Sequence, residues 1–157
     1  MRGPLTVRSW ARRAACVGLL FAGGAANVDA ACTISASGVS FGSYDVFVPA
    51  PTDSTGTVVY RCGNTDKDVR ITLTTGSSGT FVARTLKKTS DQVVYNLFRE
   101  AARTTVWGDG TGSTGYYFDR NPPNNQDVVV TVYGRIPALQ DAAAGSYTDA
   151  VIVQVDF

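Results

Sequence analysis

The C-terminal segment, residues 145–157, constrains the fold more than any other part of this chain. Apolar side chains occupy one parity of its positions: Tyr147, Val151, Val153, Val155 and Phe157. Asp149 is the only polar residue of that parity. Since side chains of a strand point alternately to its two faces, the pattern predicts a β-strand with an apolar inner face. Nothing follows the strand to cover its free edge, so we expect this edge to pair with another chain. The alternative is a domain whose last strand is already flanked within the chain.

The rest of the sequence predicts further short strands and almost no helix. Residues 46–55 are expected to form a loop, and residues 99–103 have room for one helical turn. Turn signals recur between the strands at nearly regular spacing, which is typical of an all-β sandwich. The predicted strands, besides the last, are 33–35, 39–44, 57–62, 69–73, 81–86, 93–98, 116–118 and 128–136.

Residues 1–30 have the pattern of a secretory signal peptide. Four arginines precede an apolar run over 14–26, and Val28 and Ala30 stand where a signal peptidase reads small residues. We expect cleavage after Ala30, which leaves 31–157 as one domain. The run is too short to cross a bilayer, which takes roughly 20 residues. A lipoprotein signal ending at Cys32 is the alternative, but Asp29 stands where such signals carry an apolar residue.

The mature domain should be nearly neutral. Removing four of the 14 basic and one of the 13 acidic residues leaves ten and twelve, a net charge of −2. This balance gives no electrostatic reason to bind nucleic acid or an anionic membrane. Cys16 leaves with the signal peptide, and Cys32 and Cys62 most simply form one disulfide in an exported chain. A redox or metal-binding pair is the alternative, without support from a CxxC spacing or a histidine.

Residues suited to catalysis are scarce. The absence of histidine removes Ser-His-Asp and Cys-His nucleophiles and the common zinc sites. The motif G-x-G-x-x-G occurs at 110–115, but no strand–helix unit surrounds it, so a turned loop is the simpler interpretation. Asp109 alone offers too few carboxylates for a calcium loop. We therefore expect no enzyme, no cofactor and no metal site.

Several segments together resemble the spore coat protein U domain family, the subunits of archaic chaperone–usher pili. The most specific is Ala101-Ala-Arg-Thr-Thr-Val-Trp-Gly-Asp-Gly110. The resemblance covers nearly all of the mature chain. The other segments that carry it are 32–36, 39–45, 57–62, 132–137 and 145–149, together with 95–100 and 111–112 on either side of the specific block.

This resemblance implies an immunoglobulin-like β-sandwich that lacks its final strand, with a disulfide between Cys32 and Cys62. A periplasmic chaperone would first lend the missing strand. A neighbouring subunit's N-terminal extension would then replace it during assembly at the outer-membrane usher. The subunit would pass through the periplasm to the cell surface.

Two groups of residues are candidates for this function. The predicted groove wall for the incoming strand is Tyr147, Val151, Val153, Val155 and Phe157, with the carboxylate of Phe157 as an anchor for the chaperone. Exposed apolar loop tips, at Phe47, Val48 and Trp107, are candidates for adhesion. The alternative for the groove wall is ordinary core packing. The alternative for the loop tips is that Trp107 belongs to the core and Phe47 is an incidental surface residue.

Cleavage after Ala30 would leave only Ala31 before Cys32. Such a subunit could accept a strand but not donate one, so we expect a position at the end of a fibre, most simply the tip, or a coat protein that does not polymerise. A self-sufficient secreted β-sandwich that binds a ligand through its loops is the first alternative. A small secreted hydrolase is the second.

Overall fold

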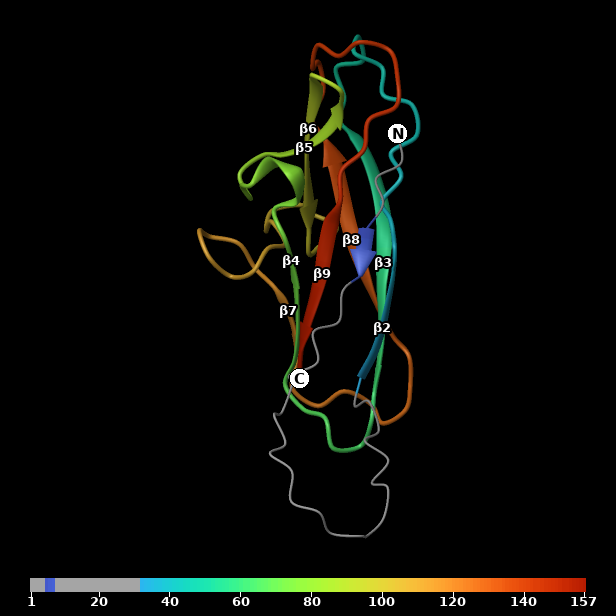
Figure 1. Ribbon diagram of the computed structural model, residues 1–157, viewed down its shortest axis with the longest axis vertical. Coiled ribbons are helices and arrows are strands. Elements are labelled where there is room, and N and C mark those ends of the chain that lie inside the picture. Colours follow the sequence, from blue (N-terminus) through green and yellow to red (C-terminus); the bar gives the residue numbers. More distant parts are fainter. Residues whose placement is uncertain (1–4, 8–31) are drawn as a thin grey trace, which may run out of the picture.

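The computed structural model describes residues 5–7 and 32–157 of the chain. The predicted cleavage site after Ala30 lies outside the described residues. Strands dominate the described part, together with one short 3-10 helix (Figure 1). The elements are β1 (Leu5–Val7), β2 (Cys32–Ser37), β3 (Thr52–Cys62), β4 (Val69–Leu73), η1 (Gly76–Ser78), β5 (Arg84–Lys88), β6 (Asp91–Phe98), β7 (Tyr117–Asp119), β8 (Val128–Ile136) and β9 (Val151–Asp156).

Two sheets face each other in an immunoglobulin-like sandwich. One has the strand order β1-β9-β4-β7 and the other the order β2-β3-β8-β6-β5. Every strand pair is antiparallel except β1 with β9, which is parallel. The all-β fold predicted from the sequence is confirmed. No helix in the described part of the chain has the length and apolar character needed to cross a membrane.

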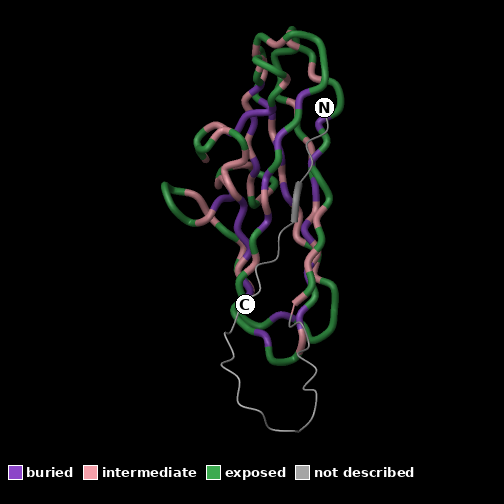
Figure 2. The backbone as a smooth tube through the Cα atoms, in the orientation of Figure 1, coloured by how far each residue is buried: buried purple, intermediate pink, exposed green. Residues whose placement is uncertain are grey.

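The core lies between the sheets and follows the period-two alternation of the strands. In β3 the buried residues Val58, Tyr60 and Cys62 alternate with more exposed ones, and β6 shows the same pattern. Figure 2 shows the buried positions running along the inner strands, while the loops at both ends are largely exposed. Alternating side chains on two facing sheets produce this arrangement.

Gly134 in β8 makes room for a loop that fills part of the core. A Cβ on Gly134 would lie 2.7 Å from side-chain atoms of both Phe41 and Val39, so only glycine permits this packing. Both residues are buried although they lie outside any strand. The sequence predicted a strand over 39–44 and is wrong there: the alternation reflects burial of two side chains without a ladder of backbone hydrogen bonds.

Two further predictions of local structure are wrong. β3 begins at Thr52, so part of the predicted loop 46–55 is strand; its pairing with β8 continues to Thr52 opposite Ile136. Residues 99–103 form no helix. The backbone N–H of Arg103 donates to the carbonyl of Glu100 at 3.0 Å, and a positive φ of 55° at Arg103 ends this single turn.

Arg84 is a charged residue in the middle of the core, with no exposed surface. Its guanidinium donates to the carbonyl of Thr74 through Nε (3.1 Å) and Nη2 (2.9 Å), and to Asn96 Oδ1 through Nη1 (2.7 Å). Nη2 also donates to the carbonyl of Trp107 at 2.7 Å. Burial lowers the pKa of Arg84 to about 10, so the group remains charged at neutral pH. The network ties β5, β6 and the 99–107 segment to the end of β4.

Replacing Arg84 with methionine should lower the free energy of unfolding by about 3 kcal/mol or more. The apolar side chain leaves the acceptors of Thr74, Asn96 and Trp107 without their buried donor, and a buried group left unsatisfied costs about 1–3 kcal/mol. Urea unfolding of the purified chain measures the change. Arg61→Met, which removes an exposed pair with Asp127, is the matched control and should cost less than about 1 kcal/mol. Equal losses of unfolding free energy in the two variants would contradict a stabilising role for the hydrogen bonds of Arg84.

Candidate functional site

The candidate site is the outer edge of β9, the strand that the sequence pattern singled out. On its inner side β9 pairs with β4, with Leu73 opposite Val153 and Arg70 opposite Asp156. Val151 and Val153 are buried, Val155 is half-buried, and Phe157 lies beyond the strand with 56% of its surface exposed. Three of the predicted groove residues, Val151, Val153 and Val155, therefore lie on one face of β9, while Tyr147 lies before the strand and Phe157 beyond it.

The other side of β9 carries β1. The pairing is parallel, with Leu5 opposite Val151, Thr6 opposite Ile152 and Val7 opposite Val153. Figure 1 shows β1 between β9 and the β2–β3 side of the sandwich, and β1 also lies close to β2. The predicted free edge is thus wrong for the full chain, because β9 has a strand on each side. The second strand comes from the segment predicted to be removed as a signal peptide.

Asp149, the polar exception in the pattern, is buried and fully engaged just before β9. Its Oδ1 accepts hydrogen bonds from the backbone N–H groups of Ser77 (2.8 Å) and Ala150 (2.9 Å). Its Oδ2 accepts one from the hydroxyl of Tyr95 at 2.7 Å. Burial, together with the nearby charge of Asp149, raises the pKa of Tyr95, so this hydroxyl keeps its proton and remains the donor. The carboxylate thereby fixes the entry of β9 to both η1 and β6.

The chain changes sheet immediately before β9. Thr148 exchanges both of its backbone hydrogen bonds with Lys87 of β5, at 2.8 and 3.0 Å. Four residues later, Ile152 donates to Thr74 Oγ1 at 2.9 Å and accepts from the Thr74 N–H at 3.0 Å, on the other sheet. The predicted strand from 147 is therefore two segments. β9 itself starts only at Val151 because the first segment pairs with β5.

The backbone groups that point to the outer edge of β9 can be assigned from this pairing. Ile152 directs its N–H and C=O toward Thr74 on the β4 side. Since successive residues of a strand point their backbone groups to opposite sides, those of Val151, Val153 and Val155 point to the outer edge. The same three residues point their side chains to the interior. A strand that pairs with this edge therefore also covers their side chains.

On the other side of β1 from β9 lies β2 (Figure 1). Its inward-facing residues, Cys32, Ile34 and Ala36, pack against the core but are only partly buried. Inner-strand residues in equivalent positions, such as Val58 and Ile71, have no exposed surface. Partly buried core residues therefore lie along β2, at Val155 of β9 and at Val128 and Val130 of the central strand β8.

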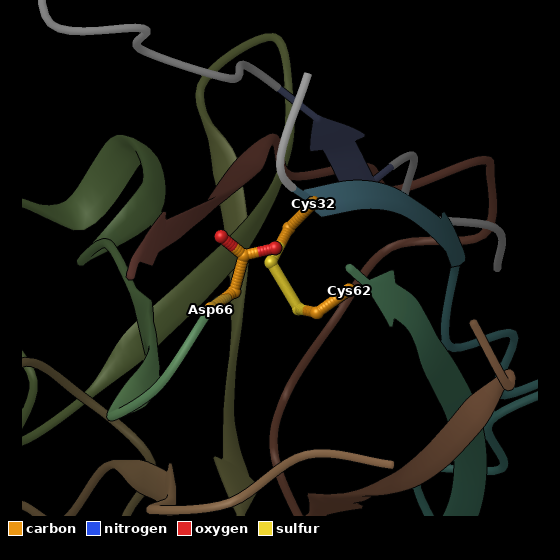
Figure 3. A group of neighbouring side chains, drawn as sticks. All are labelled: Cys32, Cys62 and Asp66. Carbon is orange, nitrogen blue, oxygen red and sulfur yellow. A yellow bond between two sulfur atoms is a disulfide. The ribbon is translucent and has the colours of Figure 1, made fainter. Parts of the chain in front are cut away.

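A disulfide fixes one end of β2 to β3. Cys32 and Cys62 lie directly opposite in the strand register and are bonded, so the predicted disulfide is confirmed. Figure 3 shows Asp66 beside them, and the potential ligand atoms of these three residues lie within 4.8 Å of one another. Both sulfurs are held in the disulfide, so neither is available as a thiolate. Asp66 Oδ2 instead accepts a hydrogen bond from the Gly63 N–H at 2.8 Å and closes the turn after β3.

Replacing both Cys32 and Cys62 with serine should lower the free energy of unfolding by about 3.5–4 kcal/mol. The disulfide closes a loop with a sequence separation of 30, and removing it frees the unfolded chain. Urea unfolding of the oxidised protein and of the double variant measures the loss. Reduction of the unmodified protein with dithiothreitol should reproduce it. A reduced protein as stable as the oxidised one would contradict this account.

Two of the predicted adhesive residues lie at the end of the sandwich where β8 stops. Phe47 is 86% exposed and Val48 is 44% exposed, and Leu139 in the facing loop is 62% exposed. The two loops are joined through Tyr44, whose hydroxyl donates to the carbonyl of Pro137 at 2.9 Å and accepts from the Gln140 N–H at 2.8 Å. An adhesive function of Phe47 and Val48 remains a prediction.

Trp107 does not belong to this surface. It has no exposed area, and its indole Nε1 donates to the carbonyl of Ile71 at 3.0 Å. Its backbone N–H donates to the carbonyl of Leu97 at 2.8 Å, which fixes it between the two sheets. Its assignment to an adhesive loop is wrong, because the glycine-rich sequence after it suggested an exposed loop while the tryptophan itself fills the core.

Sequence reasoning missed two buried polar groups. One is Arg84, although it shares parity with Leu86 in a predicted strand, and a charge at an inward position was the available signal. The other is Tyr60, fully buried in β3, whose hydroxyl donates to Asp119 Oδ2 at 2.7 Å and lies 3.1 Å from the hydroxyl of Tyr117. Burial raises the pKa of Tyr60, so its hydroxyl stays protonated. No local pattern joined these three residues.

Comparison with known proteins gives consistent results. The model of the Spore Coat Protein U domain family matches residues 19–154. Protein U of Myxococcus xanthus is 28% identical over 149 residues, an alignment that covers 84% of this chain and 80% of that protein.

A solved structure with the same fold is the chaperone–tip adhesion subunit pre-assembly complex, CsuC–CsuE, from the archaic chaperone–usher Csu pili of Acinetobacter baumannii. The similarity has a TM-score of 0.54 and 24% sequence identity, and it covers 80% of this chain. This chain spans only 39% of the matched chain's length. At this sequence identity, the similarity shows a shared fold and nothing more.

Proposed function

Because this chain belongs to the Spore Coat Protein U domain family, we propose that it is an exported structural subunit of a chaperone–usher pilus or surface coat. Residues 1–30 direct its export, and the mature domain passes through the periplasm to the cell surface. Its partners are a periplasmic chaperone, the outer-membrane usher and a neighbouring subunit. Its role is assembly, and no catalytic step or cofactor is involved.

The observation that carries the proposal is the partial burial of core residues on β9 and β2, the two strands that β1 contacts. Val155 on one strand and Ile34 and Ala36 on the other are only partly buried, although all three pack against the core. The edge-directed backbone groups of β9 lie on the side of that strand where β1 pairs. After removal of residues 1–30, β9 would keep β4 as its only neighbour.

A strand from a partner would supply both a hydrogen-bonding neighbour for β9 and side chains that cover the partly buried core residues. Its backbone pairs with the outward N–H and C=O groups of β9, and its alternate side chains enter the groove. The chaperone supplies this strand first, and a neighbouring subunit replaces it in the assembled fibre. Val151, Val153 and Val155 form the wall that the donor side chains contact, and Tyr147 fixes the start of that wall.

The energies involved are large enough to decide whether the domain is stable. Four donor side chains at about 1.5–3 kcal/mol each would contribute roughly 6–12 kcal/mol before ordering costs. The net stability of a whole domain is about 5–15 kcal/mol. A mature subunit without a partner strand should therefore be marginal, and we expect it to be degraded or to aggregate in the periplasm unless its chaperone is co-expressed.

A charge at the groove should block the partner strand. We expect Val155→Asp to weaken binding of the chaperone at least about tenfold, since an unpaired carboxylate would be buried beneath the incoming strand. Co-expression in the periplasm with a chaperone from the same organism, followed by affinity measurement on the purified complex, tests this. Gln154→Asp places the same charge on the neighbouring, exposed position and is the matched control.

The control variant should bind the chaperone as the unmodified subunit does. A stable mature monomer that needs no chaperone, or equal binding by both variants, would overturn the proposal. A stable mature monomer would favour the self-sufficient binding module.

The exposed loop end supports adhesion as a second candidate function. Phe47, Val48 and Leu139 present apolar surface at one end of the sandwich, beside an open cavity of about 450 Å³ lined by residues 42–46 and 142–145. Exposed apolar side chains gathered at one end are typical of a binding surface. This role suits a subunit at the end of a fibre, the position expected from the sequence.

Adhesion through this end should depend on Phe47 and Leu139. The double substitution to serine should reduce retention of the chaperone-bound subunit on polystyrene severalfold, because it removes the two most exposed apolar side chains there. Val129→Ser is the control, since Val129 is also 62% exposed but lies on the outer face of β8. A loss of retention equal to that of the control would remove this second function.

A further inference from the structure

A carboxylate lies against the disulfide between β2 and β3. An oxygen of Asp66 and the sulfurs of Cys32 and Cys62 all lie within 4.8 Å of one another, and Figure 3 shows the carboxylate beside the sulfur–sulfur bond. Asp66 is 8% exposed and Cys62 is 1% exposed, so water screens this group only weakly. The carboxylate is therefore close enough to act on any charge that develops on the sulfurs.

The turn after β3 holds the carboxylate in this position. Asp66 Oδ2 accepts a hydrogen bond from the backbone N–H of Gly63 at 2.8 Å, and the Asp66 N–H donates to the Gly63 carbonyl at 3.4 Å. Arg61, two strand positions from the turn, pairs instead with Asp127 at 2.7 Å. Among the described residues, Asp66 forms no ion pair, so its charge is not neutralised by a bound cationic side chain.

The two sulfurs differ in how easily an external molecule can reach them. Cys62 is buried, it forms a β-bridge with Asn124, and its carbonyl accepts a hydrogen bond from the Asn125 N–H at 2.9 Å. Cys32 begins the edge strand β2 and is only partly buried. An external thiol therefore has to attack Cys32 Sγ, and the sulfur of Cys62 has to leave.

We propose that the carboxylate of Asp66 protects the disulfide from reduction by small anionic thiols. In the first step of reduction a thiolate attacks Cys32 Sγ and forms a mixed disulfide, while the bond to Cys62 breaks and its electron pair leaves on the Cys62 sulfur. A second thiolate attacks the external sulfur of the mixed disulfide, which releases Cys32 as a thiolate together with a small-molecule disulfide. The two cysteine thiolates take up the two protons that the external thiols lost on ionisation.

Asp66 opposes the first step in two ways. Its charge repels an anionic thiolate that approaches Cys32, and it destabilises the negative charge that develops on Cys62, which makes that sulfur a poorer leaving group. Both effects slow reduction. The protection would keep the edge strand β2 joined to β3 wherever the domain meets such thiols, and it does not depend on a partner strand.

Reduction by thiols of opposite charge tests the proposal. The oxidised subunit, as purified from the periplasm with or without a bound chaperone, is treated with cysteamine, which carries a cationic group, or with mercaptopropionate, which carries an anionic one, at equal thiolate concentrations. Alkylation of the released cysteines and mass spectrometry of the subunit give each rate. The same two rates in urea, where the chain is unfolded, give the baseline. We expect the ratio of the cysteamine rate to the mercaptopropionate rate to be at least about tenfold higher in the folded protein.

A variant pair separates the charge of Asp66 from its structural role. Asp66→Asn keeps an oxygen acceptor for the Gly63 N–H but removes the charge, so the ratio should fall to that of the unfolded chain. Asp68→Asn removes an equal charge two residues away, from a side chain that is 65% exposed and pairs with Arg120 at 3.9 Å, and should leave the ratio unchanged. If Asp66→Asn keeps the ratio of the unmodified protein, or if Asp68→Asn lowers it equally, the proposal is overturned.

The unmodified protein gives a result even if Asp66→Asn does not fold. Equal ratios in the folded and the unfolded protein would show that the thiols are reduced in rate by access alone, and would exclude protection by charge. None of these rates requires a chaperone or a partner strand. The proposed function and the protection by Asp66 can therefore fail independently of each other.

Discussion

The pairing of β9 with β4 determines whether the interior of this sandwich is closed. It brings Val151 and Val153 into the core opposite the other sheet, where they have almost no exposed surface. The strand is short and follows a change of sheet, so local propensity alone would hold it weakly. Asp149 compensates for this, because its carboxylate fixes the entry of the strand to η1 and β6. Burial of Val151 and Val153 and the hydrogen bonds of Asp149 together fix the position of β9, and with it the position of its outer edge.

The two edges of β9 differ in the length of the strand pairing. Four residues of β9 pair with β4, and three pair with β1 on the outer side. A net gain of about 1 kcal/mol for each hydrogen bond makes a three-residue strand a modest addition, while buried apolar side chains contribute more per residue. A longer donor with several inward side chains would therefore compete well for the same edge.

Alternation was sufficient to predict two of the strands that lie between two others in this fold. The ranges 69–73 and 128–136 are confirmed as β4 and β8, because each strand packs one face against the core. The disulfide followed from two cysteines in an exported chain. The pattern could not identify the neighbours of a strand, so it gave no sign that Leu5–Val7 would pair with β9. The pattern also misplaced Trp107. The glycines after it indicate a loop, but the position of the indole depends on hydrogen bonds to Ile71 in β4 and Leu97 in β6, which no local pattern indicates.

The change of sheet before β9 affects how the strand responds to an incoming partner. Thr148 is bonded to β5 in one sheet, and Ile152 is bonded to Thr74 in the other. A slip of β9 by a single residue would break both sets of bonds and turn its valines toward solvent. The position of β9 along its neighbours is therefore fixed. A donor strand has to adopt the register that β9 sets, because β9 cannot shift.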